Sequence, residues 1–234
     1  MIVLLSILLA NISFGFLLTK FDGFGFNETY LLVASKLVYI SVILYFCSRY
    51  KLLNFKLFRV DFYFALALVL AVMSYYQMNA WLATSTLVRS EHSHFDYIIR
   101  CLSTGFFEEI LFRVFVFYSL LKIFKFKKLI HPIWIASILF GLAHTSNVLN
   151  PDYVSISVLA QIVFAIFIGF FFQSILVYTK SYVLVAVLHA VVNYFGMYES
   201  YLFIREMDKT PYLISDLLGS IALLGAVFIL IRAI

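Results

Sequence analysis

The sequence predicts an all-α fold, a polytopic membrane bundle of about eight helices. Three observations support this prediction. Hydrophobic residues make up 64% of the 234-residue chain, and its mean hydropathy is +1.02. Only 12% of the residues are charged, about half the share in an ordinary soluble domain. The apolar residues are also grouped into runs long enough to cross a bilayer as helices.

The expected helices follow one another with short connections. They cover residues 1–19, 29–47, 62–83, 97–121, 132–149, 154–178, 181–198 and 211–232. The first is interpreted as a membrane helix, because it lacks the basic start and the small-residue cleavage site of a signal peptide. Cys47 and Cys101 lie in or beside apolar runs, so they are expected to be core residues and not a disulfide.

The basic residues predict the orientation of the bundle. Ten of them fall in loops or helix ends on one side, including the loop Lys122–Lys128, and four fall on the other. By the positive-inside rule, the richer side is cytoplasmic, and so are both termini. The prediction is therefore a multi-pass protein of the cell membrane. The net charge of +5 is modest, and no nucleic-acid partner is expected.

The apolar run STGFFEEILFRVFVF, residues 103–117, contains Glu108, Glu109 and Arg113. A charged side chain at bilayer depth costs roughly 2.5–3.5 kcal/mol, so these residues need partners or water. Two further polar groups are His144 in the fifth expected helix and His189 with Asn193 in the seventh. Counted from the cytoplasmic helix ends, they and Glu108 lie about 12–21 Å deep, within one central slab. The sequence therefore predicts a buried polar cavity.

Helical spacing assigns different roles to the two glutamates. Glu109 and Arg113 are four residues apart and can pair on one face. Glu108 points about 100° away and is expected to face the histidines. Each cluster also has a purely structural interpretation: an ion pair for Glu109, or helix–helix hydrogen bonding for His144 and for His189 with Asn193. Their convergence at one depth favours a functional site.

These residues resemble the motifs of the CPBP family, which includes type II CAAX prenyl endopeptidases and bacteriocin-processing or immunity proteins, often called the Abi family. The family patterns EExxxR, FxxxH and HxxxN are similar to Glu108–Arg113, Phe140–His144 and His189–Asn193. The resemblance covers residues 97–198, and each motif lies in an apolar run. Val114 departs from it, since many members have glycine after the arginine. The chain is accordingly divided into N-terminal helices 1–96, a catalytic core 97–198 and a C-terminal loop and helix 199–234.

The resemblance implies an intramembrane endopeptidase of the glutamic type, with no cofactor. By this likeness, Glu108 and His144 activate water for attack on a peptide carbonyl. His189 and Asn193 stabilise the oxyanion. Glu109, Arg113 and Phe140 support the site. The implied partners are the lipid bilayer and a peptide or protein substrate; prenylated peptides, peptide pheromones and bacteriocin precursors all remain open, as does the oligomeric state.

Other functions stay open at this point. Glu108, His144 and His189 are an acceptable set of zinc ligands, which would make the protein a metalloprotease. A non-catalytic bacteriocin-immunity factor or regulatory membrane partner is the alternative outside enzymology. A proton-coupled transporter is a third class, although the chain shows no repeated halves. His92 and His94, beside Glu91 and Asp96, are interpreted as a solvated turn and not as a metal site.

Overall fold

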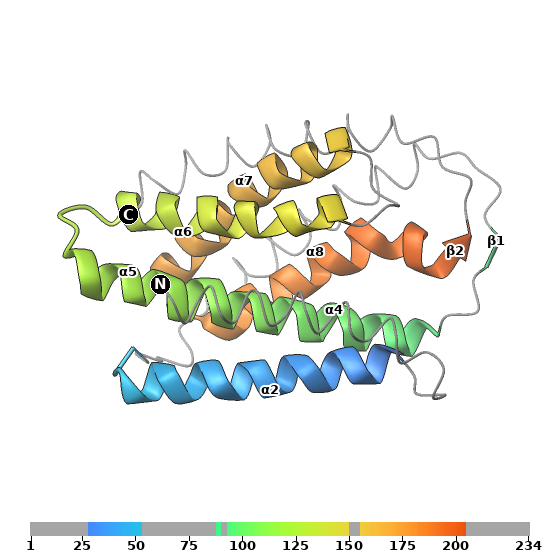
Figure 1. Ribbon diagram of the computed structural model, residues 1–234, viewed down its shortest axis with the longest axis horizontal. Helices are drawn as coiled ribbons and strands as arrows, with labels where there is room; N and C mark the ends of the chain where they lie inside the picture. Colours follow the sequence, from blue (N-terminus) through green and yellow to red (C-terminus); the bar gives the residue numbers. More distant parts are fainter. Residues whose placement is uncertain (1–27, 53–87, 90–92, 150–154, 205–234) are drawn as a thin grey trace.

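The computed structural model describes residues 28–52, 88–89, 93–149 and 155–204, which form a bundle of roughly aligned helices (Figure 1). Its elements are α2 Glu28–Arg49, α4 His94–Glu109, the π-helix η2 Ile110–Val116, α5 Phe117–Phe124, α6 Ile130–Ala143, the 3-10 segment η3 His144–Leu149, α7 Ser155–Thr179 and α8 Tyr182–Leu202. Two short strands, β1 Val88–Arg89 and β2 Phe203–Ile204, pair antiparallel. The described part is otherwise helical, as the sequence predicts.

Five of the expected membrane helices coincide with described helices, at positions 29–47, 97–121, 132–149, 154–178 and 181–198. The expected helices 1–19, 62–83 and 211–232 lie outside the described residues, as do both termini. Within the described part, two helices are long and apolar enough to cross a membrane, Thr29–Arg49 and Val158–Thr179. The sequence predicts that the fifth helix continues to residue 149, and this end is wrong. The α-helix α6 ends at Ala143, and His144–Leu149 form the 3-10 segment η3.

Glycine allows a close contact between helices α4 and α8. A Cβ atom at Gly105 would lie 2.8 Å from the backbone nitrogen of Ala190 and 2.9 Å from the carbonyl oxygen of Ala186. Only a residue without a side chain lets α4 approach the backbone of α8 so closely. Glu109 follows Gly105 by one helical turn, so this contact brings the glutamates next to α8.

The helix that contains the glutamates changes its geometry immediately after them. The α-helical hydrogen bonding of α4 ends at Glu109, and the next seven residues are π-helical before α5 begins. The sequence predicts one continuous helix over 97–121, so the π-helix is a difference that only the structure reveals. Such wide turns are frequent at functional sites. All seven side chains of η2 are buried, including that of Arg113.

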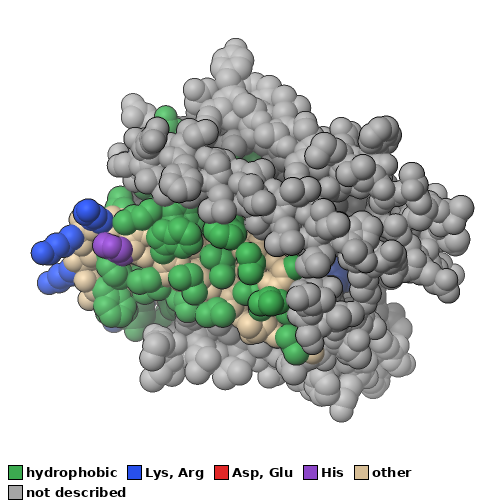
Figure 2. Space-filling view, turned by 90° about the horizontal axis from the view of Figure 1, so that it is seen from above, with side chains coloured by type: hydrophobic (Ala, Val, Ile, Leu, Met, Phe, Trp, Pro, Cys, Tyr) green, Lys and Arg blue, Asp and Glu red, His purple; other side chains and the backbone are tan. Residues whose placement is uncertain are grey.

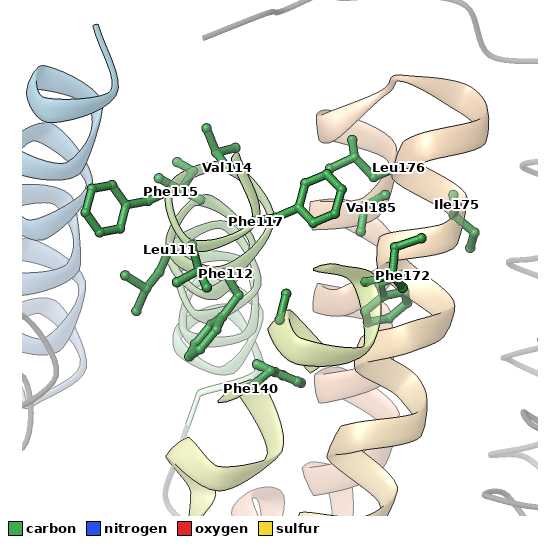
Figure 3. Packing of buried hydrophobic residues seen from close by; sticks show 14 of the residues in the cluster. Leu111, Phe112, Val114, Phe115, Phe117, Phe140, Phe172, Ile175, Leu176 and Val185 are labelled. Carbon is green, nitrogen blue, oxygen red and sulfur yellow. The ribbon is translucent and has the colours of Figure 1, made fainter. Parts of the chain in front are cut away.

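Aromatic side chains fill the centre of the bundle. One cluster of buried residues contains Phe112 from η2, Phe117 from α5, Phe140 from α6 and Phe172 from α7 (Figure 3). In contrast, α2 exposes large apolar side chains, among them Val38 at 62%, as expected for a helix that faces lipid.

Four lysines gather at the end of the bundle where α5 turns into α6. Lys122, Lys125, Lys127 and Lys128 are all exposed. In the space-filling view, Lys and Arg side chains cluster at one end of the visible face, beyond a band of hydrophobic side chains (Figure 2).

Candidate active site

The two adjacent glutamates have different surroundings. The Glu109 side chain is fully buried, and its Oε2 lies 3.0 Å from Nε of Arg113, which is equally buried. The side chain of Glu108 remains 23% exposed. The Glu109–Arg113 pair expected from the sequence is confirmed, although Arg113 is in the π-helix and not in a continued α-helix.

His189 of α8 lies between the two carboxylates. Its Nδ1 is 2.7 Å from Oε1 of Glu109, and its Nε2 is 3.4 Å from Oε2 of Glu108. An ionised carboxylate only accepts hydrogen bonds, so Nδ1 donates to Glu109. The Nε2 distance is beyond the usual hydrogen-bond length. Glu109 therefore orients the imidazole, and Glu108 keeps its oxygens for another partner.

This arrangement differs from the sequence-based one, in which Arg113 alone neutralised Glu109 and Glu108 alone faced the histidines. Both glutamates approach His189, and Glu109 makes the shorter contact. The difference arises because α8 packs directly against α4 at Gly105. That packing places His189 opposite both carboxylates.

Phe140 connects the two histidines and the arginine. Its ring centroid lies 5.1 Å from that of His144 and 5.7 Å from that of His189, with both pairs edge-to-face. The guanidinium carbon of Arg113 lies 4.7 Å from the Phe140 centroid, in cation–π geometry. Phe140 thus holds groups from three helical elements at one depth.

His144 is oriented by its own helix. Its Nδ1 lies 3.0 Å from the carbonyl oxygen of Phe140, one turn earlier. A carbonyl oxygen accepts, so Nδ1 carries the proton and Nε2 is left as a proton acceptor. His144 is only partly buried. Among the described residues, no ion pair or hydrogen bond joins His144 to Glu108.

Asn193 follows His189 by one turn of α8. Its side-chain Nδ2 is buried and has no hydrogen-bond partner among the described residues. Its backbone oxygen accepts a hydrogen bond of 3.1 Å from the hydroxyl of Tyr97, which is buried in α4. The backbone at Asn193 is therefore fixed while its amide donor is available to another molecule.

The sequence prediction missed several residues around the site. Phe172 of α7 packs 5.3 Å from the His189 ring, and Tyr97 anchors α8. Neither an aromatic residue in an apolar helix nor a tyrosine near its end stands out in the sequence. Lys36 is different, because a lysine inside an apolar span is a recognisable signal. Lys36 donates a hydrogen bond to Thr104, one turn before Glu108.

The described side chains do not form a metal-binding cluster: the part of the chain that the structure describes contains no group of three or more His, Cys, Asp and Glu side chains that could hold a metal ion. His92 lies outside the described residues.

Comparison with known families matches the part of the chain that builds this site. The model of the Rce1-like family, described as type II CAAX prenyl endopeptidase Rce1-like, matches residues 90–195. This segment is therefore similar to the Rce1-like family. The comparison with curated proteins finds no match, and neither does the comparison with solved structures.

The Rce1-like segment includes α4, η2, α6 and α7 and most of α8, so it contains every site residue named in the sequence analysis. The resemblance noted from the three motifs is confirmed by this match. The family indicates a CAAX-type protease, and the apolar helices indicate a membrane protein. The helix α2, with Lys36, lies outside the Rce1-like segment.

Proposed function

We propose that this protein is an intramembrane endopeptidase of the glutamic type, which cleaves a peptide bond of a membrane-associated substrate. The observation that supports this function most directly is the asymmetry of the two glutamates. Glu109 is buried and bound to both His189 and Arg113, whereas Glu108 is partly exposed beside the same imidazole. One carboxylate is thus suited to hold the site and the other to act on a bound molecule.

In the proposed reaction, Glu108 and His144 bind one water molecule. The Glu108 carboxylate accepts a proton from the water, and the oxygen attacks the peptide carbonyl carbon. The carbonyl oxygen becomes an oxyanion. Collapse of this intermediate breaks the C–N bond, and the proton held by Glu108 passes to the leaving nitrogen. The products are a new carboxylate and a free amine.

The oxyanion requires hydrogen-bond donors that are in place before the reaction. Asn193 supplies Nδ2, a buried donor with no partner among the described residues. His189 lies one turn away on the same face of α8 and is fixed by Glu109. This supports the assignment of His189 and Asn193 to oxyanion stabilisation. Prenylated peptides and bacteriocin precursors are candidate substrates.

The first prediction separates the two glutamates by substitution with glutamine. Glu108→Gln keeps the shape of the side chain but cannot accept the proton, so turnover should be abolished while folding is retained. Glu109→Gln leaves Arg113 as an uncompensated buried charge and should lower the free energy of unfolding by about 3–5 kcal/mol. A peptide-cleavage assay and a thermal melt in detergent, run on each purified variant, measure the two effects.

The outcomes of this experiment distinguish the competing functions. An E108Q variant that cleaves at the normal rate would refute the catalytic assignment and favour a bacteriocin-immunity or regulatory role. Normal stability of E109Q would contradict the structural role of Glu109. Gln161→Ala is a suitable control for the assay, because Gln161 accepts a hydrogen bond from Asn147 of η3 and is not among the proposed catalytic groups.

A further inference from the structure

Lys36 is the one charged residue in the interior of α2. The only other charged residues of this helix are Glu28 and Arg49 at its two ends. Lys36 is partly buried, and eight residues, or about 12 Å along the helix, separate it from Glu28. A lysine at this depth in an apolar helix is costly and is commonly paired or functional.

The packing of α2 on α4 directs Lys36 toward the active site. Two contacts define the register of these helices: Lys36 Nζ donates to Thr104 Oγ1, and the rings of Tyr39 and Phe107 lie 6.1 Å apart. The two helices lie side by side (Figure 1). Thr104 and Glu108 are four residues apart, so they share one face of α4. Lys36 therefore lies one helical turn from Glu108 on the side toward α2.

Lys36 is electrostatically coupled to Glu108 without touching it. Burial acts most strongly on the ammonium group, because it removes solvation; Glu108 attracts the group and Arg100 repels it. The ion pairs within 4.0 Å in the described part of the chain are Arg113–Glu109 and the two contacts of His189, and none involves Lys36. Thr104 occupies one of the three ammonium donors.

The two glutamates differ in their cationic partners. Arg113 is in direct contact with Glu109, whereas no Lys or Arg in the described part of the chain lies within ion-pair distance of Glu108. A positive charge one turn away attracts this carboxylate while leaving its oxygens accessible to water.

We propose that Lys36 is the counter-cation of Glu108, a positioning residue supplied by a helix outside the Rce1-like segment. Its catalytic consequence rests on the proposed function, whereas the charge coupling itself does not. The neutral hydroxyl of Thr104 holds the ammonium group one turn away from the carboxylate. Direct contact would instead compete with the water for Glu108.

The coupling is tested by a double-substitution cycle on the full-length protein in detergent, with the melting temperature as readout. The four proteins are the unmodified chain, K36M, E108Q and K36M/E108Q. We expect K36M to be more destabilising by about 2–4 °C in the unmodified background than in the E108Q background. This difference holds whatever the effect of K36M alone, which also removes a buried charge. Additive effects of the two substitutions would overturn the proposal.

Matched controls isolate the Lys36–Glu108 pair. Lys122 lies in α5 and donates a hydrogen bond to the backbone oxygen of Tyr50. The effects of K122M and E108Q on the melting temperature should therefore be additive. K36M combined with E109Q should show weaker coupling, because Glu109 has its own cation. If either control shows coupling as large as that of K36M with E108Q, the effect is one of general electrostatics. That result would refute a specific Lys36–Glu108 pair.

A kinetic arm tests the catalytic consequence. K36M should lower kcat at least about tenfold with little change in KM, and K36R should restore most of the rate because it keeps the charge. An unchanged kcat in K36M, or no rescue by K36R, would overturn the positioning role. If the unmodified protein cleaves no peptide, the proposed function fails, and the melting cycle still decides whether Lys36 and Glu108 are coupled.

Discussion

The residues of this site fall into a buried supporting group and a second group that can contact another molecule. Glu109 and Arg113 are fully buried and in contact, and His189 is held by Glu109 at 2.7 Å. Glu109 contacts both other groups, which fixes the three side chains relative to one another. Glu108, His144 and Asn193 each retain an atom that can engage another molecule. The proposed water activation is therefore assigned to Glu108 and His144, and the proposed oxyanion binding to Asn193 together with His189.

The residue-scale prediction concerns Asn193. If its free Nδ2 binds the oxyanion, Asn193→Ala should lower kcat by roughly 10²–10³ with little effect on KM. The melting temperature should change little, because the described structure gives this nitrogen no partner to lose. Steady-state kinetics and a melt provide the measurement. Asn147→Ala is the control, since Asn147 donates to Gln161 and lies in η3. Equal kinetic losses in the two variants would argue against an oxyanion role.

At the scale of elements, the contact between α4 and α8 determines the geometry of the site. These helices pack backbone to backbone at Gly105, and the glutamates follow within one turn. The π-helix η2 then turns the chain so that Arg113 remains buried beside Glu109 and over the Phe140 ring. The site is thus built where one helix changes its geometry and packs closely against a second helix.

The element-scale prediction is that Gly105→Ala disturbs both folding and activity. The added Cβ would lie 2.8 Å from a backbone nitrogen, so α4 and α8 must separate. Overpacking of this kind costs about 1–3 kcal/mol of stability. It should also lower kcat, because the Glu109–His189 contact spans the same interface. Thermal melts and cleavage assays report the two effects. Ser103→Ala, on the same helix, should leave both unchanged; an equally stable and active G105A variant would show that the contact is not needed.

At the scale of the whole molecule, the distribution of charge complements the apolar surface. The exposed lysines lie at one end of the described bundle, beyond its apolar band (Figure 2). The candidate active site lies farther along the helices, away from this lysine-rich end. This distribution fits a protein whose basic end faces the cytoplasm and whose charged site is within the membrane.

The whole-molecule prediction concerns this orientation. With the α5–α6 connection in the cytoplasm, a cysteine introduced as Phe126→Cys should not react with a membrane-impermeant thiol reagent added to intact cells. Ser93→Cys, at the opposite end of α4, should react. Cys47 and Cys101 are buried, so the unmodified protein serves as the background control. Labelling of the Phe126→Cys variant from outside would reverse the predicted topology.

The sequence alone was sufficient for properties that depend on local patterns. Long apolar runs predicted five of the described helices, because the hydropathy needed to cross a bilayer is a property of each segment. The spacing of Glu109 and Arg113 predicted their pairing, because residues one turn apart share a helical face. The three motifs also indicated the family whose model matches residues 90–195.

Tertiary structure decided how those local elements face one another. The bond between His189 and Glu109 depends on the rotation of α8 about its axis relative to α4, which Gly105 and its alanine neighbours determine by close packing. The approach of Lys36 depends in the same way on the register between α2 and α4. No periodicity within one helix contains this information, because rotation and register are properties of a pair of helices in contact.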